Sequence, residues 1–206
     1  MVGVTEPATP TTFRNEVVAW GPDGHVVGVY EKVHRVPFGE YVPLRGLVGH
    51  LANLSGVALD AVPGHGSGLL RTPAGPLGLL VSFEVFYADR SHASVRAGAQ
   101  LLAVPTNTSS YATSQVPAQE LAAAATQAVE TGRDLVQAAP TGFSAVVTQR
   151  GVIVARSSLG ARQVLLATVA LRRGLTPYDR WGDLPVLIGA AGALVTGWIR
   201  QRRSSS

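Results

Sequence analysis

Two alternating runs of β-branched and polar residues near the N-terminus predict a β-hairpin. They cover residues 16–20 and 25–30, and the Gly21-Pro22-Asp23-Gly24 segment between them is typical of a tight turn. Val2-Gly3-Val4 predicts the edge of a further strand, and the Pro- and Thr-rich residues 7–12 predict a loop after it. The first part of the chain therefore favours a sheet.

Apolar runs and helical segments alternate in the middle of the chain. Residues 46–68 are rich in glycine and predict a loop, with one helical turn near residues 50–54. Continuous apolar runs are typical of strands buried on both faces, whereas an alanine-rich run between a proline and a glycine is typical of a helix. This alternation predicts a layered α/β fold. The expected strands are residues 77–84, 100–105, 135–139, 144–149, 152–156 and 163–170, and the expected helices are residues 88–97 and 117–132.

The C-terminal part has a different pattern. Leu184 to Ile199 is a run of 16 residues without a charge, with Trp181 and Trp198 at its edges and a basic segment after it. The tryptophans are separated by about 26 Å of helix, close to the roughly 30 Å of a hydrocarbon core. Aromatic edges and a basic tail favour a transmembrane helix whose C-terminus is cytoplasmic. The alternative is a buried core helix, because the run is short and contains three glycines.

Composition narrows the chemistry. Hydrophobic residues make up 46% of the 206 residues and charged residues 15%, so the chain is too apolar to be disordered. It has no cysteine, which excludes disulfides, thiolate metal sites and a cysteine nucleophile. The histidines lack metal-ligand spacing and the arginines are scattered, so we expect no metal, no cofactor and no nucleic-acid partner. Lys32 is the only lysine among 17 Lys and Arg residues, which suggests a need for lysine chemistry there, although a plain surface lysine remains the alternative.

The segment around Lys32 resembles the catalytic-lysine segment of the nitrilase superfamily. The sequence Lys32-Val33-His34-Arg35 followed by Val36-Pro37-Phe38-Gly39-Glu40-Tyr41-Val42-Pro43 is similar to the apolipoprotein N-acyltransferase branch in particular. The resemblance extends over roughly residues 1–199. It implies a nitrilase-like α-β-β-α layered sandwich, present in part, followed by the last membrane helix of the family. On this basis residues 1–175 form the carbon-nitrogen hydrolase domain, 176–183 a linker, 184–199 the transmembrane helix and 200–206 a basic cytoplasmic tail.

The resemblance also implies the site residues. Nitrilase-type chemistry uses a thiol nucleophile, a carboxylate that takes its proton, and a lysine that stabilises the oxyanion. In Val81-Ser82-Phe83-Glu84, Ser82 stands where the family has cysteine, and no upstream carboxylate matches the family's base. A serine that uses Lys32 as its base, as in Ser-Lys hydrolases, is a further reading. The implied catalytic residues are Lys32, Ser82, Glu40 and Glu84, and the implied substrate contacts are Phe83, Asn107 and Tyr41; His34 is expected to orient the lysine loop.

The implied function is transfer of a fatty acyl chain from a phospholipid to the N-terminal diacylglyceryl-cysteine of a bacterial lipoprotein. The domain would lie outside the cytoplasmic membrane, with the tail of residues 200–206 inside. Residues 1–10 predict no signal peptide, and a domain that opens in mid-sheet predicts an N-terminal truncation, with the missing half as a possible partner. The altered nucleophile keeps two alternatives open, a non-catalytic membrane-tethered pseudoenzyme and one half of a split enzyme. A soluble amidase is a weaker third.

Overall fold

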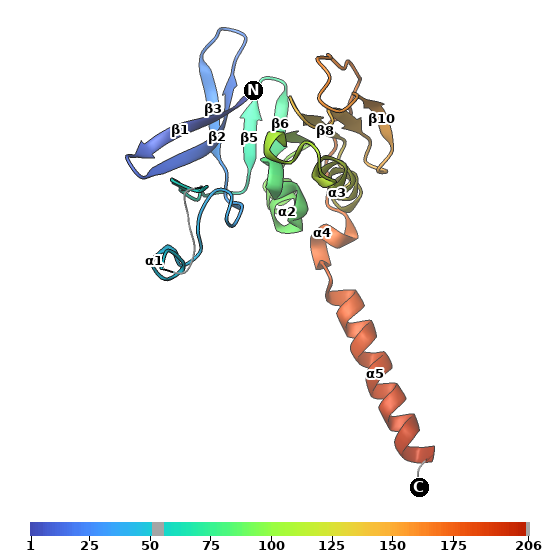
Figure 1. Ribbon diagram of the computed structural model, residues 1–206. Coiled ribbons are helices and arrows are strands. Elements are labelled where there is room, and N and C mark those ends of the chain that lie inside the picture. Colours follow the sequence, from blue (N-terminus) through green and yellow to red (C-terminus); the bar gives the residue numbers. More distant parts are fainter. Residues whose placement is uncertain (51–55, 205–206) are drawn as a thin grey trace.

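The computed structural model describes residues 1–50 and 56–204, which form two β-sheets, a helical layer and a projecting C-terminal helix (Figure 1). The strands are β1 (Val2–Thr9), β2 (Thr12–Trp20), β3 (Val26–Glu31), β4 (Asp60–Ala61), β5 (Leu69–Thr72), β6 (Gly75–Leu79), β7 (Leu101–Pro105), β8 (Leu135–Ala138), β9 (Ala145–Val147) and β10 (Ile153–Arg156). The helices are α1 (Arg45–Val48), α2 (Ala88–Arg96), α3 (Val116–Thr131), α4 (Pro177–Trp181) and α5 (Leu184–Ser204), with 3-10 turns η1 (Ser82–Phe86) and η2 (Ser109–Tyr111).

The two sheets differ in strand direction. In the first sheet β2 pairs antiparallel with both β1 and β3 and parallel with the short β4. The second sheet has the order β10-β9-β8-β7-β6-β5, in which β6, β7 and β8 are parallel, and β5 pairs antiparallel with β6, β9 with β8 and β10 with β9. The parallel strands place the segments that follow β6 and β7 at one edge of this sheet, where ligand-binding loops of α/β sheets gather.

Two apolar cores hold three layers together. Helices α2 and α3 cover one face of the second sheet, with side chains such as Leu121 and Val95 packed on Leu102 and Leu135. The other face of this sheet packs on the first sheet. The two sheets approach closely at Gly28, where an added Cβ would lie 2.3 Å from Leu70 Cδ1. The layers therefore run α–β–β, in agreement with the expected α/β class.

Local patterns predicted many of these elements. The hairpin of residues 16–30, the helices at 88–97 and 117–132, and the strands at 100–105 and 135–139 are confirmed to within a few residues. Helix α3 ends where Gly132 adopts a left-handed φ of 61°, the conformation that glycine favours at a helix C-terminus. The one helical turn expected at residues 50–54 falls mainly on residues 51–55, which lie outside the described residues, and the described turn is α1 instead.

Three expectations were wrong. Residues 77–84 are not one strand, because β6 ends at Leu79 and the chain turns at Ser82 into η1. Residues 163–170 are not a strand: the Ala170 N–H donates to a side chain, Asp134 Oδ2 at 2.8 Å, rather than to a neighbouring strand. The loop expected at residues 7–12 is partly strand, since β1 continues to Thr9.

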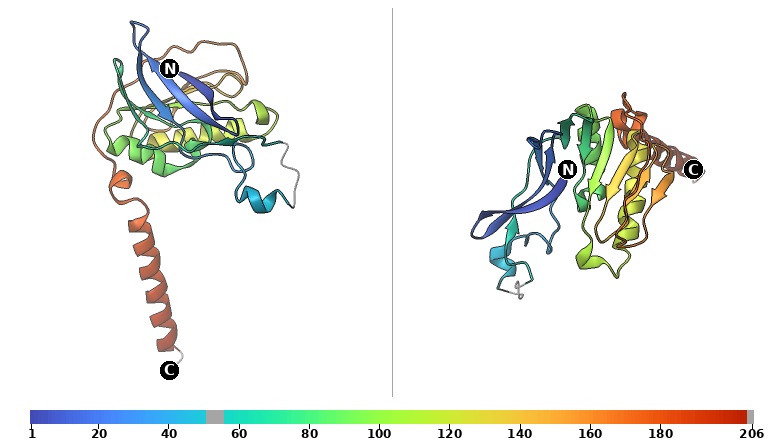
Figure 2. Two further views of the ribbon diagram at one scale, coloured as in Figure 1. Left: turned by 90° about the vertical axis from the view of Figure 1, so that its left-hand side faces the viewer. Right: turned by 90° about the horizontal axis from the view of Figure 1, so that it is seen from above.

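Helix α5 projects away from the layered domain in both side views (Figures 1 and 2). Its 21 residues span about 32 Å at the usual rise per residue. In the described chain, Leu184–Arg202 is the one helix long and apolar enough to cross a membrane by length and composition, and its side chains are exposed. The helix is thus longer than the expected residues 184–199, because it continues through the basic residues that follow.

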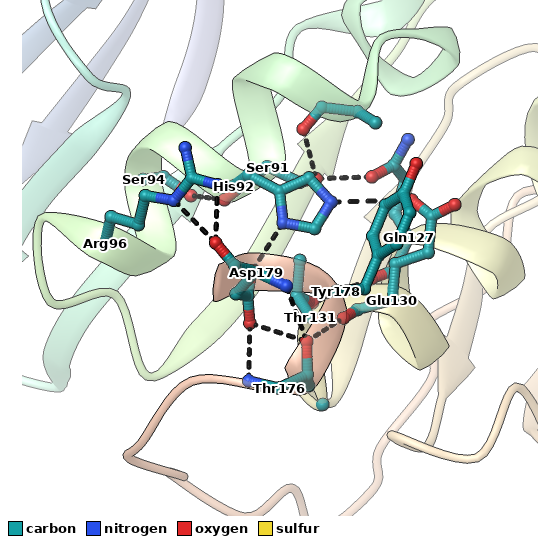
Figure 3. A network of polar contacts seen from close by, with 12 residues as sticks. Ser91, His92, Ser94, Arg96, Gln127, Glu130, Thr131, Thr176, Tyr178 and Asp179 are labelled. Carbon is teal, nitrogen blue, oxygen red and sulfur yellow. Dashed lines mark hydrogen bonds and ion pairs between the residues drawn. The ribbon is translucent and has the colours of Figure 1, made fainter. Parts of the chain in front are cut away.

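A buried polar network joins α4, and with it the base of α5, to the domain (Figure 3). His92 Nδ1 of α2 bonds the fully buried Asp179 of α4, while His92 Nε2 lies 3.7 Å from Glu130 Oε2 of α3. Thr176 Oγ1 donates to the Glu130 carbonyl at 2.6 Å, and the Arg96 Nε donates to the Asp179 carbonyl at 2.8 Å. The segment expected as a linker therefore contains a helix that is fixed to the domain.

We expect Asp179→Ala to release α4 from the domain. The change leaves the buried His92 ring and the Thr176 N–H without their partner, which costs about 3 kcal/mol of unfolding free energy. Denaturant unfolding and limited proteolysis around Gly174 in detergent would measure this. The control Asp183→Ala removes an exposed carboxylate that only accepts from Tyr178 Oη, so it should cost less than about 0.5 kcal/mol. Equal stability of both variants would contradict the conclusion that Asp179 fixes α4 to the domain.

Candidate active site

The buried carboxylate of Glu84 ties two distant segments together. Its side chain is 0% exposed. Oε1 accepts from the backbone N–H of Val33 at 2.7 Å and of His34 at 3.1 Å, and Oε2 accepts from the N–H of Val81 at 2.8 Å. Tyr30 Oη donates to the same carboxylate at 3.0 Å. These donors fix the segment after β3, which carries Lys32, beside the turn that carries Ser82.

Lys32 directly follows β3 and is buried, with 2% of its side chain exposed. Its Nζ donates to Glu40 Oε1 at 2.6 Å, and Asn15 Nδ2 donates to the same oxygen at 2.7 Å. Glu40 Oε2 accepts from the Val36 N–H at 2.8 Å, which closes the intervening loop. A buried ammonium needs such a partner, because an unpaired buried charge is strongly destabilising. The geometry presents a fixed cation at the end of β3.

His34 holds the outer side of the same loop. Its ring stacks on Tyr87 with centroids 4.2 Å apart, and its Nε2 lies 3.0 Å from Asp89 Oδ2. These contacts anchor the ring on the segment that runs from η1 into α2. The ring therefore links the two segments, and an orienting role for His34 stays a prediction.

Ser82 occupies a strained turn between β6 and α2. Its φ is 49°, a left-handed conformation that is uncommon for residues other than glycine. Such strain is concentrated at functional sites, where surrounding structure holds it in place. Ser82 Oγ donates to Glu120 Oε1 of α3 at 3.0 Å, and Thr106 Oγ1, after β7, donates to Glu120 Oε2 at 2.7 Å.

A cavity of about 360 Å³ opens beside this turn. Its volume lies in the range of small-molecule sites, which are usually lined by apolar side chains with a few polar groups. Ser82 and Glu120 are two of the polar residues in its wall. The other lining residues are Val36, Phe83, Phe86, Asn107, Thr108, Tyr111, Val116 and Gln119.

The sequence-predicted residues fall into three groups. Lys32, Glu40 and Glu84 form the polar framework described above, and Ser82, Phe83 and Asn107 line the cavity. Tyr41 is not among the lining residues; its ring lies under the guanidinium of Arg35, 4.1 Å from the ring centroid to Cζ. Within residues 1–50 and 56–204, no group of three His, Cys, Asp or Glu residues could hold a metal ion.

Glu120 is the residue that sequence reasoning missed. Only 2% of it is exposed, and burial raises the pKa of its carboxyl, although hydrogen bonds from Thr106 and Ser82 and the charge of Lys32 act in the opposite direction. In the sequence it appears as an ordinary acidic residue in the first turns of a helix. A weak signal was available, because Glu120 stands next to Leu121 on the face of α3 that packs on the sheet.

The layered α/β domain thus places a buried lysine beside a turn that carries a strained serine. The family described as "Carbon-nitrogen hydrolase" matches residues 1–174. The chain therefore belongs to the carbon-nitrogen hydrolase family, which confirms the superfamily resemblance of the Lys32 segment.

The curated relatives of this chain include apolipoprotein N-acyltransferases. The chain is 36% identical over 193 residues to the Apolipoprotein N-acyltransferase of Geobacter metallireducens, and 38% identical over 196 residues to that of Gloeobacter violaceus. These matches cover 94% and 95% of this chain but 37% of each relative, so the chain spans little more than a third of their length.

Two solved structures share the fold. The carbon-nitrogen hydrolase from Helicobacter pylori G27 matches with a TM-score of 0.57 at 20% identity, over 76% of this chain and 57% of that one. Saccharomyces cerevisiae Nit3 of the nitrilase superfamily matches with a TM-score of 0.56 at 22% identity, over 77% of this chain and 54% of that one. The nitrilase-like fold is thus supported by structures of distant sequence.

We expect Glu84→Gln to loosen the site while conserving its shape. The amide nitrogen would face backbone N–H donors, which leaves buried groups unpaired and costs about 3 kcal/mol of unfolding free energy. Denaturant unfolding in detergent measures the loss. Asp89→Asn is the matched control, because its carboxylate is exposed and contacts the His34 ring, and it should cost less than about 0.5 kcal/mol. A Glu84→Gln protein as stable as the control would contradict this role.

Proposed function

We propose that this chain carries the acyl-transfer centre of an apolipoprotein N-acyltransferase. The substrates would be a phospholipid acyl ester as donor and the N-terminal diacylglyceryl-cysteine of a bacterial lipoprotein as acceptor. The observation that carries the proposal is the buried Lys32–Glu40 pair, which Glu84 fixes beside the Ser82 turn. The names of the curated relatives supply the substrate class.

Each site residue has a role in this proposal. Ser82 is the nucleophile and forms an acyl-ester with the donor chain. Lys32 stabilises the oxyanion that develops on the donor carbonyl, and Glu40 holds the ammonium in place. Glu84 is a positioning residue, because its oxygens are already occupied by backbone and tyrosine donors.

The cavity suits an acyl chain. Phe83, Phe86 and Val116 give its wall an apolar character, and Ser82 lies at its polar part. Asn107 is placed to contact a polar group of the substrate, although its Oδ1 already accepts from Ser109 N–H and Thr141 Oγ1. Tyr41 serves the site indirectly, by carrying Arg35 on its face.

The membrane arrangement is part of the same proposal. Helix α5 crosses the cytoplasmic membrane, so that the layered domain lies outside it and Arg200 and Arg202 lie in the cytoplasm. The fourth layer of an α-β-β-α sandwich would cover the outer face of the first sheet, where Val27 and Val29 are exposed.

Lys32→Arg tests the chemical assignment. A planar guanidinium cannot take the place of an ammonium beside the oxyanion, so acyl transfer should fall by about 10²–10³-fold despite the retained charge. The measurement is transfer from labelled phospholipid to a diacylglyceryl-peptide by the protein in lipid nanodiscs. Arg71→Lys, at an exposed position, is the control and should transfer at the unmodified rate. Full activity of Lys32→Arg would refute the role of Lys32 in stabilising the oxyanion. Phospholipid binding by the unmodified protein without any acyl transfer would favour the non-catalytic alternative.

A tag placed after Ser206 tests the topology. We expect it to react with an impermeant reagent only after the cytoplasmic membrane has been opened, because the basic residues after the apolar helix favour the cytoplasmic side. A tag before Val2 should react in intact spheroplasts if the domain lies outside. Labelling of the C-terminal tag in intact spheroplasts would contradict the orientation.

A further inference from the structure

The Ser82–Glu120 contact has a geometry that general base catalysis requires. Ser82 Oγ is the donor and Glu120 Oε1 the acceptor, 3.0 Å apart. A base must lie within about 2.6–3.2 Å of the proton donor that it serves. Both groups line the same cavity, so a carbonyl carbon bound there would meet the serine oxygen with the carboxylate next to it.

Glu120 also lacks a structural explanation for its burial. In the described part of the chain no arginine, lysine or histidine nitrogen lies within ion-pair distance of its carboxylate. Its hydrogen-bond partners among the described residues are two hydroxyl groups, those of Ser82 and Thr106. A buried carboxylate without a cationic partner reduces stability, whereas a neutral glutamine could fill the same space. Such a group, in a cavity and next to a strained serine, is typical of a functional site.

We propose that Glu120 is the catalytic general base of this centre and that it activates Ser82 directly. The inference rests on the proposed acyl-transfer function. It assigns the proton acceptor that the serine needs, because an alcohol, unlike a thiol, scarcely ionises and requires a dedicated base. Thr106 is a positioning residue that fixes the second carboxylate oxygen.

The reaction balances in two half-reactions. In the first, Ser82 Oγ bonds to the donor carbonyl carbon while its proton passes to Glu120, and Lys32 stabilises the oxyanion. The ester bond to the glycerol oxygen then breaks, and Glu120 returns the proton to the leaving alcohol. In the second, the acceptor amine attacks the acyl-ester, Glu120 takes a proton from that amine, and Ser82 Oγ leaves and regains it. The products are an amide and free Ser82.

The electrostatics favour this role. Burial raises the pKa of Glu120 from that of an ordinary glutamate, which makes the carboxylate a stronger base. The charge of Lys32 and the two hydroxyl donors oppose the shift and keep the ionised form accessible. Because the ionised form is the active one, acylation should increase as pH rises through the pKa of Glu120 and reach a plateau above it.

The test is acylation of Ser82 by p-nitrophenyl octanoate in the purified full chain in detergent, followed by mass spectrometry of the modified peptide. The good leaving group needs no proton, so the rate isolates activation of the serine. Glu120→Gln should slow acylation by about 10²–10⁴-fold and abolish the pH-dependent limb. Glu120→Asp, which keeps the base one methylene further away, should be intermediate.

Two comparisons separate a base from a merely structural residue. In the Ser82→Cys protein the thiol ionises more readily, so the same Glu120→Gln change should slow acylation less than about tenfold. Glu130→Gln is the matched control on the same helix, because burial also raises the pKa of Glu130, which faces His92 instead, and it should leave the rate unchanged. Acylation of Ser82 by Glu120→Gln within threefold of the unmodified rate, or equal losses in the serine and cysteine backgrounds, would overturn the inference.

The acylation assay tests Glu120 separately from the transfer of the acyl chain to an acceptor. Glu120-dependent acylation of Ser82 without transfer to a diacylglyceryl-peptide would support the base and refute the proposed function. Transfer to the peptide with a normal rate in Glu120→Gln would support the function and refute the base. Absence of any octanoyl adduct on Ser82 would also refute the role of Glu120 as its general base.

Discussion

The site depends on one buried carboxylate. Glu84 accepts hydrogen bonds from Val33 and His34 on one segment and from Val81 on another, 48 residues later in the sequence than Val33. A fully buried carboxylate is stable only when its oxygens are occupied, so these donors and the acceptor hold each other in place. The clamp and the His34 contacts with Tyr87 and Asp89 together hold the Lys32 loop beside the Ser82 turn.

Three buried or half-buried glutamates meet around this clamp, and their partners separate their roles. Glu84 accepts from backbone donors and is a structural centre. Glu40 neutralises Lys32 and closes the loop through the Val36 N–H. Within the described part of the chain Glu120 has hydroxyl partners only, which leaves it the one of the three suited to exchange a proton with substrate.

The domain and its projecting helix are also connected by polar contacts. The His92–Asp179 pair and the Thr176 hydroxyl fix α4 on α2 and α3, and α5 begins three residues after α4 ends (Figure 3). Since α3 also carries Glu120, the same helix bears a site residue near its N-terminus and the contacts with α4 near its C-terminus. The element that precedes α5 is therefore fixed to the same helix that carries Glu120.

The sequence by itself determined the local features: the hairpin, helices α2 and α3, the Lys32 segment with its family resemblance, and the cavity-lining Ser82, Phe83 and Asn107. These depend on turn chemistry, helix signals and a contiguous motif, all encoded within short windows. Tertiary structure alone decided that β6 ends early in the strained Ser82 turn, that the Ala170 N–H donates to Asp134 rather than to a strand, and that Glu120 meets Ser82. The last two depend on groups 36 and 38 residues apart in the sequence, and no local pattern carries the energy of such contacts.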